Sequence, residues 1–567
     1  MQSPDSPPEQ KTQYSKSFDE RTYINKERAY SLLSGAQKNT QWVLPASSNL
    51  TTSNVSFSIR TTQEQIIDRR IFIRYYVTLA FTGTGNPLLQ IGTNDALRSF
   101  PMTTSMLNCT VNIGNQSFSE QVRDYIQALA RFVDPDMANY GMGSFPNMPD
   151  QYQQYVDWVT YGSGRNPLAL YGENSAQENR GGFALESITN GNGTATLNVV
   201  ITEPLFISPL NWSVEDVPGI CGVENIDIQM QFDLANGGLS RLWSHASSGN
   251  TLTAITATFY QPPECLYTQL VANPKTMPFF QNKIYEYPYS NIDTSLQSSS
   301  TAVASGATAT IQSSQTTLSG IPEKVYIYAK RINSDQTYLT SDTFASIENI
   351  NITYNTQAGI LARATKQDLY DISVRNGLKM AYNQFTNYCG SVVCLQFGSD
   401  IPLNDNDCPG SSSSYQFNVS AQIKNTSSAS VNYVLYVVFQ YAGVMSIQNR
   451  LVEKKNYLLN SNEIGALLES NIPIVMNKRY ITGEAMGSGF FGDLWSGIKN
   501  AASRASDFIK PFVPVVASAI SPMLQERAQG IIKSLTGGAM SGGAMSGGAM
   551  SGGAMNRRML AKKLSSQ

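Results

Sequence analysis

The stretch that decides the fold is Ile71-Phe72-Ile73-Arg74-Tyr75-Tyr76-Val77-Thr78-Leu79-Ala80-Phe81. Most of these residues are β-branched or aromatic, and apolar side chains recur at every second position, which is typical of a strand with one face on a core. The segments 55–59 and 106–113 alternate in the same way. We therefore expect a long strand at 71–81 within a β-rich domain.

Further strands follow in two groups of similar size. The first group continues with 194–202, 226–232 and 252–260, and the second comprises 279–289, 324–331, 345–355, 391–397, 415–424 and 431–441. Residues 121–132 predict a helix, because apolar side chains share one face: Val122, Ile126, Leu129 and Phe132. The segment 134–175 predicts a long loop, and 295–320, rich in Ser, Thr, Ala and Gln, predicts a loop or low-complexity insertion.

Many short strands with few helices indicate antiparallel sandwiches rather than a parallel α/β fold. One sandwich rarely needs a body of this length, so we expect a mainly β fold of two tandem antiparallel jelly rolls with a C-terminal amphipathic helical tail. One jelly roll beside a different β-domain stays open. The expected division is a flexible arm at 1–44, jelly rolls at 45–262 and 263–460, a linker at 461–488, an amphipathic helical segment at 489–535, and a glycine-repeat and basic tail at 536–567.

Charge is scarce in this chain. Only 14% of the 567 residues are charged, against roughly 25% in an average soluble protein, and the formal net charge is −2. Such a composition fits surfaces that meet other protein, and it offers no general attraction to nucleic acid or to acidic membranes. The N-terminus has no signal-peptide core and no apolar run reaches the ~18 residues that span a bilayer, so we expect a protein made in the cytosol.

Catalytic chemistry is hard to place on this sequence. The single histidine, His245, lies in a polar context that predicts a loop, and no G-x-S-x-G motif supplies a nucleophile for it. The acidic segments 215–216 and 405–407 predict solvated turns rather than calcium sites. Six scattered cysteines form no C-x-x-C pair and predict buried free thiols: Cys109, Cys221, Cys265, Cys389, Cys394 and Cys408. We therefore expect no enzyme, no cofactor and no metal.

The period of the apolar residues becomes helical at residue 490. An apolar stripe faces a polar and partly cationic side, and such a helix can lie in a membrane interface. The residues expected to contact membrane are Phe490, Phe491, Leu494, Trp495, Ile498, Phe508 and Ile509. The alternative, that the stripe packs against the β-body, stays open.

A Gly-Gly-Ala-Met repeat and a basic end follow this stripe. Paired glycines favour an extended and accessible chain of the kind that a protease binds, although a plain flexible linker has the same composition. No acidic residue follows Glu526, and the positive charge at the end of the chain comes from Arg557, Arg558, Lys562 and Lys563. These four predict a weak, salt-sensitive contact with nucleic acid, with a solubilising terminus as the alternative.

The body resembles double jelly-roll major capsid proteins of the adenovirus, polinton-like and virophage group of DNA viruses. The resemblance spans roughly residues 45–460 and rests on four strand-like strings, Ile66-Ile67-Asp68-Arg69-Arg70-Ile71-Phe72, Leu97-Arg98-Ser99-Phe100-Pro101, Ile321-Pro322-Glu323-Lys324-Val325-Tyr326-Ile327-Tyr328-Ala329 and Asn432-Tyr433-Val434-Leu435-Tyr436-Val437-Val438-Phe439. The tail from Gly489 resembles the membrane-lytic, protease-processed minor capsid protein of adenovirus-like viruses, here joined to the shell protein.

The resemblance implies a viral capsid protein that self-assembles into the virion shell, made in the host cytoplasm. Three copies would form a pseudo-hexagonal capsomer, with other capsid proteins as further partners. Each repeat unit resembles the site of an adenovirus-type maturation protease, which implies cuts between Gly538 and Ala539, Gly543 and Ala544, Gly548 and Ala549, and Gly553 and Ala554. Cleavage would release the amphipathic tail to disrupt a host membrane.

Two other classes of protein are alternatives to this interpretation. A single jelly-roll capsid protein of a small RNA or ssDNA virus with a lytic C-terminal helix stays open, although the balanced charge of the N-terminal arm differs from the Arg-rich arms common there. An adhesive or carbohydrate-binding β-sandwich would be expected to carry a secretion signal, and none is visible.

Overall fold

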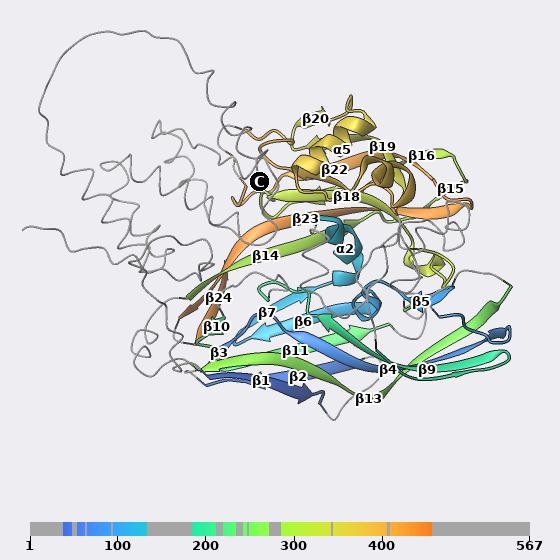
Figure 1. The fold of residues 1–567 in the computed structure, drawn as a ribbon. Helices are drawn as coiled ribbons and strands as arrows, with labels where there is room; N and C mark the ends of the chain where they lie inside the picture. Colours follow the sequence, from blue (N-terminus) through green and yellow to red (C-terminus); the bar gives the residue numbers. More distant parts are fainter. Residues whose placement is uncertain are drawn as a thin grey trace, which may run out of the picture. The chain divides into compact units, whose positions relative to one another are not determined.

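The structure is a computed structural model of the chain, and it describes residues 38–47, 54–62, 65–91, 94–132, 184–210, 219–233, 242–245, 249–271, 285–341, 344–404, 407, 409–448 and 450–455. Antiparallel β-sheet dominates these residues (Figure 1). Residues 1–37 of the predicted arm, the predicted loop 134–175 and the predicted segments from 461 onward lie outside them.

The first sandwich consists of the sheets between β1 and β13. Its seven-stranded sheet has the order β10 (Ile220–Cys221), β3 (Gln65–Ile67), β13 (Thr251–Val271), β4 (Phe72–Thr84), β9 (Thr194–Pro204) and β8 (Ala184–Asn190), with β1 (Lys38–Pro45) also on β13. The facing four-stranded sheet has the order β2 (Asn54–Arg60), β11 (Asn225–Phe232), β6 (Met106–Ile113) and β7 (Gln116–Glu120). A separate pair joins β5 (Asp95–Leu97) to β12 (Trp243–His245).

The second sandwich consists of the sheets between β14 and β24. Its six-stranded sheet has the order β14 (Tyr285–Leu296), β23 (Val431–Gln448), β18 (Lys324–Arg331) and β21 (Val393–Gln396), with β15 (Thr301–Val303) and β24 (Leu451–Lys455) also on β23. The five-stranded sheet has the order β16 (Thr308–Gln312), β22 (Gln416–Lys424), β19 (Ser346–Tyr354) and β20 (Gln357–Ile360), with β17 (Thr316–Thr317) on β22.

The burial of the strands follows from these layers. Along β2, β4, β9 and β11 buried residues alternate with more exposed ones, because one face of each strand lies on the core and the other faces outward. All eight residues of β18 are buried, and so are all four of β21. Such continuous burial requires cover on both faces of the six-stranded sheet.

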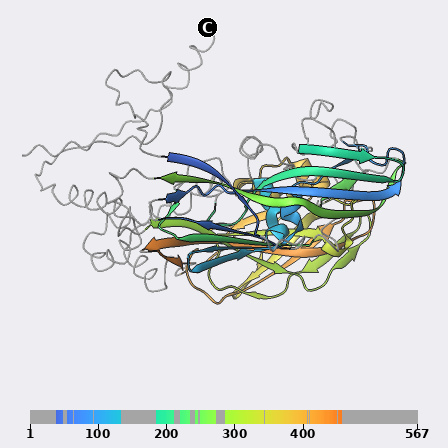
Figure 2. The same cartoon turned by 90° about the horizontal axis from the view of Figure 1, so that it is seen from below.

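Helices are few and short among the described residues. They are α1 (Pro101–Ser105), α2 (Val122–Leu129), which continues as a 3-10 turn at Ala130–Phe132, and α5 (Lys366–Arg375), with short turns at Asn333–Asp335 and Gln384–Tyr388. The segment containing α2 lies between strands of the first sandwich and the six-stranded sheet of the second (Figure 1). Figure 2 shows the same ribbon from below, with the strands of both sandwiches running across the view. The predicted helix at 121–132 is confirmed.

Most predicted strands are confirmed, including the long one at 71–81, which is β4. The prediction of a loop or insertion at 295–320 is wrong, because this segment contains β15, β16 and β17. In β16 the Ile311 side chain is buried while its neighbours face outward, so this short strand has mostly polar residues and still covers the core.

The predicted boundary between 262 and 263 falls inside β13. This strand pairs with β1, β3 and β4 of the first sandwich and ends at Val271. Pro262 and Pro263 lie where the ladder to β4 shifts register, between Gln261 and Glu264. Proline has no N–H to donate, so a strand can pass through two prolines at such an irregularity without losing ladder bonds there.

Candidate functional site

The site residues predicted from the sequence all belong to the tail. The predicted membrane contacts at 490–509, the predicted cleavage positions at 538–554 and the predicted basic contacts at 557–563 lie outside the described residues. The described body offers another candidate, the junction between the two sandwiches, where each sandwich contributes residues to the core of the other and several charged groups are buried.

Helix α2 takes part in the core of the second sandwich. Val122, Ile126 and Phe132 belong to the same buried cluster as β18, β19 and β23, although α2 directly follows β7 of the first sandwich. This packing supplies the cover that the continuous burial of β18 requires.

Aromatic contacts fix the position of this helical segment. The Phe132 ring meets the Tyr326 ring edge to face, with 5.1 Å between centroids. The Tyr328 hydroxyl donates to the backbone oxygen of Asp124 at 2.5 Å, and burial raises the pKa of Tyr328 well above its ordinary value. The Tyr328 hydroxyl therefore stays protonated and serves as a donor from the second sandwich to α2.

Arginine 131 makes a second link in the same region. Its Nη1 donates to the Gly390 carbonyl at 3.0 Å, and its guanidinium lies 4.0 Å from the centroid of the Phe344 ring. Arg131 belongs to the 3-10 turn that follows α2, whereas Gly390 and Phe344 both belong to the second sandwich. A buried cation thus joins the two sandwiches through a carbonyl and an aromatic face.

The second sandwich contributes to the first core in return. Tyr287 and Tyr289 of β14, Met445 and Ile447 of β23, and Val452 of β24 belong to the buried cluster of the first sandwich. The Tyr287 hydroxyl donates to the Gly219 carbonyl at 2.9 Å and accepts from the Cys221 amide at 3.1 Å. The sandwiches therefore exchange core residues in both directions.

Strand β24 places a lysine next to the residues that the two sandwiches exchange. Lys454 Nζ lies 4.8 Å from the Tyr289 ring centroid and 5.3 Å from that of Phe118. Burial lowers the pKa of Lys454, while the charges of Glu120 and Asp293 oppose that effect. Burial also raises the pKa of Glu120 to about 8, although the Tyr125 hydroxyl donates to this carboxyl group. The junction thus contains an acid and a base whose pKa values are shifted toward each other.

The prediction that His245 lies in a loop is wrong. It is the last residue of β12 and is 1% exposed. Its Nδ1 lies 2.8 Å from Asp95 Oδ1, and its Nε2 lies 3.1 Å from the Asn250 backbone oxygen. The residue pairs with Asp95 across the β5–β12 ladder, 150 positions away in sequence, so no local pattern could have revealed it.

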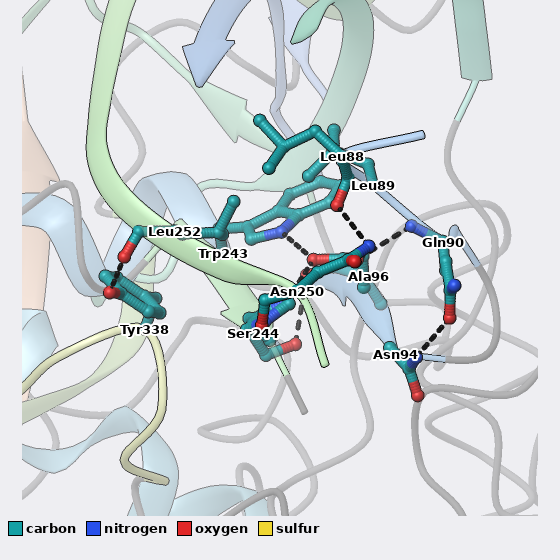
Figure 3. Close-up of polar contacts among 12 residues, drawn as sticks. Leu88, Leu89, Gln90, Asn94, Ala96, Trp243, Ser244, Asn250, Leu252 and Tyr338 are labelled. Atoms are coloured by element: carbon teal, nitrogen blue, oxygen red, sulfur yellow. Dashed lines mark hydrogen bonds and ion pairs between the residues drawn. The ribbon is translucent and has the colours of Figure 1, made fainter. Parts of the chain in front are cut away.

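Asp95 is the centre of this polar cluster. Besides His245, its carboxylate accepts from Trp243 Nε1 at 2.9 Å and from the Gln90 amide at 2.8 Å. Asn250 Nδ2 donates to the Leu88 carbonyl at 3.0 Å (Figure 3). Because Asn250 directly precedes β13, this bond links the start of that strand to the segment that contains Leu88 and Gln90. Each of the other two groups on Asp95 is a donor, which suits a carboxylate.

The cluster also reaches the second sandwich. The His245 amide donates to the Tyr338 carbonyl at 2.9 Å. The Tyr338 hydroxyl donates to the Leu252 carbonyl, as Figure 3 shows. Arg98, fully buried, donates Nε to the Trp243 carbonyl at 2.8 Å and Nη2 to the carbonyls of Thr337 and Thr340, the former at 2.6 Å. The 337–340 turn of the second sandwich is therefore held on β5 and β12 of the first.

This chemistry is structural. Both ring nitrogens of His245 have acceptors, and the neighbouring Ser244 hydroxyl donates to the Ala96 carbonyl at 3.0 Å, so no hydroxyl is paired with the imidazole as a nucleophile. Burial raises the pKa of Cys109, Cys221, Cys265 and Cys394. The prediction of buried free thiols is confirmed for these four and for Cys389. Within the described ranges, no His, Cys, Asp and Glu side chains group to hold a metal ion.

Comparison with known proteins identifies the class of molecule built in this way. The family model of the Sputnik virophage major capsid protein first domain matches residues 16–273, and the model of the major capsid protein V20 C-terminal domain matches residues 290–389 and 384–443. The two models together follow the chain through both sandwiches in order. Through both sandwiches the chain is similar to the virophage major capsid protein family. This is a family of structural proteins and not of enzymes.

Relatives of this family agree along most of the chain. The capsid protein V20 of Sputnik virophage is 27% identical over 533 residues, which cover 86% of this chain and 87% of that protein. The cryo-EM structure of the Sputnik virophage matches with a TM-score of 0.72 and 25% identity, covering 83% of this chain and 98% of that one. The crystal structure of the mavirus major capsid protein shares the fold, with a TM-score of 0.67, 14% identity and coverage of 83% and 100%.

Proposed function

We propose that this virophage-type major capsid protein forms the virion shell from two tandem jelly rolls. The observation that carries the proposal is the exchange of core residues between the sandwiches, because it makes both parts of the subunit one rigid building block. Three such subunits would supply six sandwiches, which gives a capsomer with pseudo-hexagonal outline. A shell protein needs rigidity of this kind, since each subunit must present the same surfaces to all of its neighbours.

Assembly of the purified full-length chain tests this proposal. We expect sedimentation velocity and mass photometry to find a trimer, and negative-stain images to show particles with a three-fold axis and six-sided outline. The low charge of the chain predicts that the contacts between copies survive high salt. A protein that stays monomeric across a wide range of concentration and salt would contradict the proposal.

The tail adds a second part to the proposed function. The apolar stripe with Phe491, Leu494, Trp495 and Ile498 supports a segment that is packed during assembly and later contacts membrane. A 489–535 peptide should release dye from liposomes, and Leu494→Asp with Trp495→Asp should abolish the release. A scrambled peptide of the same composition is the control, and equal leakage by the double variant would refute the membrane contact.

Processing at the glycine pairs would separate this segment from the basic end of the chain. Cleavage after Gly538, Gly543, Gly548 or Gly553 by a viral maturation protease predicts intact masses that end at those positions in purified virions. Virions that contain only full-length chains would contradict it.

The basic end remains a proposed weak contact with the genome. Neutralising Arg557, Arg558, Lys562 and Lys563 together should lower binding to DNA at low salt and have little effect at high salt. Unchanged binding by the neutralised chain would show that these residues make no such contact.

A further inference from the structure

The hydrogen bonds around His245 define its charge. Its two ring nitrogens face the Asp95 carboxylate, at 2.8 Å, and the Asn250 backbone oxygen, at 3.1 Å. A backbone carbonyl can only accept, and a carboxylate whose other partners are donors also accepts, so both ring nitrogens must donate. This geometry requires the doubly protonated imidazolium, held as a buried ion pair with Asp95.

We propose that this imidazolium is a proton-dependent lock that holds the 337–340 turn of the second sandwich on the β5–β12 pair of the first. The β5–β12 ladder has only three residue pairs, Trp243 with Leu97, Ser244 with Ala96, and His245 with Asp95. A ladder this short depends on side-chain bonds, and the His245–Asp95 bond joins its last pair. The same residue, His245, donates its amide to Tyr338 of the 337–340 turn.

Removal of one proton would break this arrangement in a defined way. A neutral imidazole would direct a lone pair at either the Asn250 carbonyl or the Asp95 carboxylate, leaving two acceptors face to face. The last pair of the ladder would then separate, and β12 would lose part of its attachment to β5. Strand β12 bonds to Tyr338 through the His245 amide and to Arg98 through the Trp243 carbonyl. The turn at 337–340 should consequently loosen as the pH rises.

The surroundings of His245 support the cationic form. The ionisable groups in contact with the ring among the described residues are Asp95 and Tyr338, whose ring lies 6.1 Å away edge to face. The neighbouring cation Arg98 attaches to β12 through Trp243, and Arg331 lies within electrostatic range of Arg98. Burial lowers the pKa of His245, but the hydrogen bond with Asp95 and its negative charge outweigh burial and raise the pKa above its ordinary value.

The sign of the pH effect follows from this raised pKa. A histidine whose pKa is higher in the folded protein stabilises the fold fully below the unfolded pKa of about 6.5, and the stabilisation is lost as the pH rises through the folded pKa. The lock is therefore closed below the unfolded pKa and opens as the pH rises through the folded pKa of His245.

Hydrogen–deuterium exchange at the histidine Cε1 position tests the charge directly. Because His245 is the single histidine, mass spectrometry of the full-length chain reports on this residue alone. We expect slow exchange with a midpoint above about 6.5. A midpoint at or below that value would overturn the proposal.

Amide exchange of the peptide that contains 337–341 tests the coupling, with labelling times scaled for the intrinsic effect of pH. In the wild-type chain, protection should fall about tenfold or more between pH 6 and pH 9.5. His245→Gln, which cannot donate to both acceptors, should show low protection at both values. If His245→Gln showed the same ratio of protection between the two pH values as the wild type, the coupling would be overturned.

Tyr338→Phe is the matched control. It removes the Tyr338 hydroxyl bond to the Leu252 carbonyl and leaves His245 and Asp95 unchanged. Protection should be lower than in the wild type at both pH values, with the same ratio between them. If His245→Gln fails to fold, the Cε1 midpoint and the protection ratios of the wild type and Tyr338→Phe still test the proposal. A ratio of protection near one between pH 6 and pH 9.5 in both of these chains would refute the lock.

Discussion

Replacement of Phe132 by alanine tests whether α2 belongs to the core of the second sandwich. The Phe132 side chain is 3% exposed, and its ring lies edge to face on Tyr326 at 5.1 Å. Truncation of a buried phenylalanine to alanine costs about 3–5 kcal/mol, of which the aromatic pair accounts for roughly 0.5–1.5 kcal/mol. Because Tyr326 keeps its hydroxyl bond to Gln440 at 3.0 Å, the remaining loss comes from the cavity and the lost apolar contact.

Urea denaturation of the full-length chain measures this loss, and native-state hydrogen exchange locates it. We expect the free energy of unfolding to fall by about 3–5 kcal/mol and the β18 peptides at 324–331 to lose protection. Gln121→Ala is the control, since Gln121 is exposed and makes no side-chain cap bond, and its change should stay within about 0.5 kcal/mol. A loss below about 1 kcal/mol for Phe132→Ala, or a loss confined to first-sandwich peptides, would refute the assignment of α2 to the second core.

Three further predictions concern other parts of the junction and the second sandwich. The stability of Glu120→Gln relative to the wild type should increase as the pH rises from 5 to 9. Burial raises the pKa of Glu120 to about 8, so the favourable contribution of this carboxyl group to the wild type is lost as the pH rises through that value. A difference in melting temperature between the two chains that stays constant across this pH range would contradict this prediction. Val452→Ala should cost about 1–3 kcal/mol and lower protection in first-sandwich peptides, since Val452 of β24 is 2% exposed within that core; loss of protection in β24 alone would refute it. Thr365→Ala should cost about 1 kcal/mol, because the Thr365 side chain accepts from the Asp368 amide in a capping box at the start of α5; circular dichroism melts measure it, and Thr365→Ser should restore most of the loss.

The alternating strands were predictable because their burial repeats along the sequence. In β4 and β11 the period of two is set by one buried and one outward face, and this period is visible in a single sequence. The same holds for α2, whose apolar face has helical spacing. Helix α5 was missed although its capping box, Thr365 with Asp368 three residues later, is a recognised signal for the start of a helix.

Other features depend on contacts that are distant in sequence. The sequence of β16 predicts part of an insertion because threonine and alanine give no period, and only pairing with β22 defines it as a strand. The local sequence predicts a loop at His245 because its partner Asp95 is 150 positions away. Buried charges of this kind are rare, so a polar local context is ordinarily correct evidence of exposure, and at this junction it is misleading.

The exchange of core residues has a consequence for synthesis on the ribosome. The first sandwich ends with β13 at Val271, but its core is complete only when Met445, Ile447 and Val452 have been made. About 180 residues separate Val271 from Val452, which at roughly 5–20 residues per second is on the order of 10–40 s. During that interval the nascent first sandwich exposes apolar surface that its own later sequence must cover. Codon usage and chaperone supply during translation of 272–452 should therefore decide how much of the chain escapes aggregation in a heterologous host.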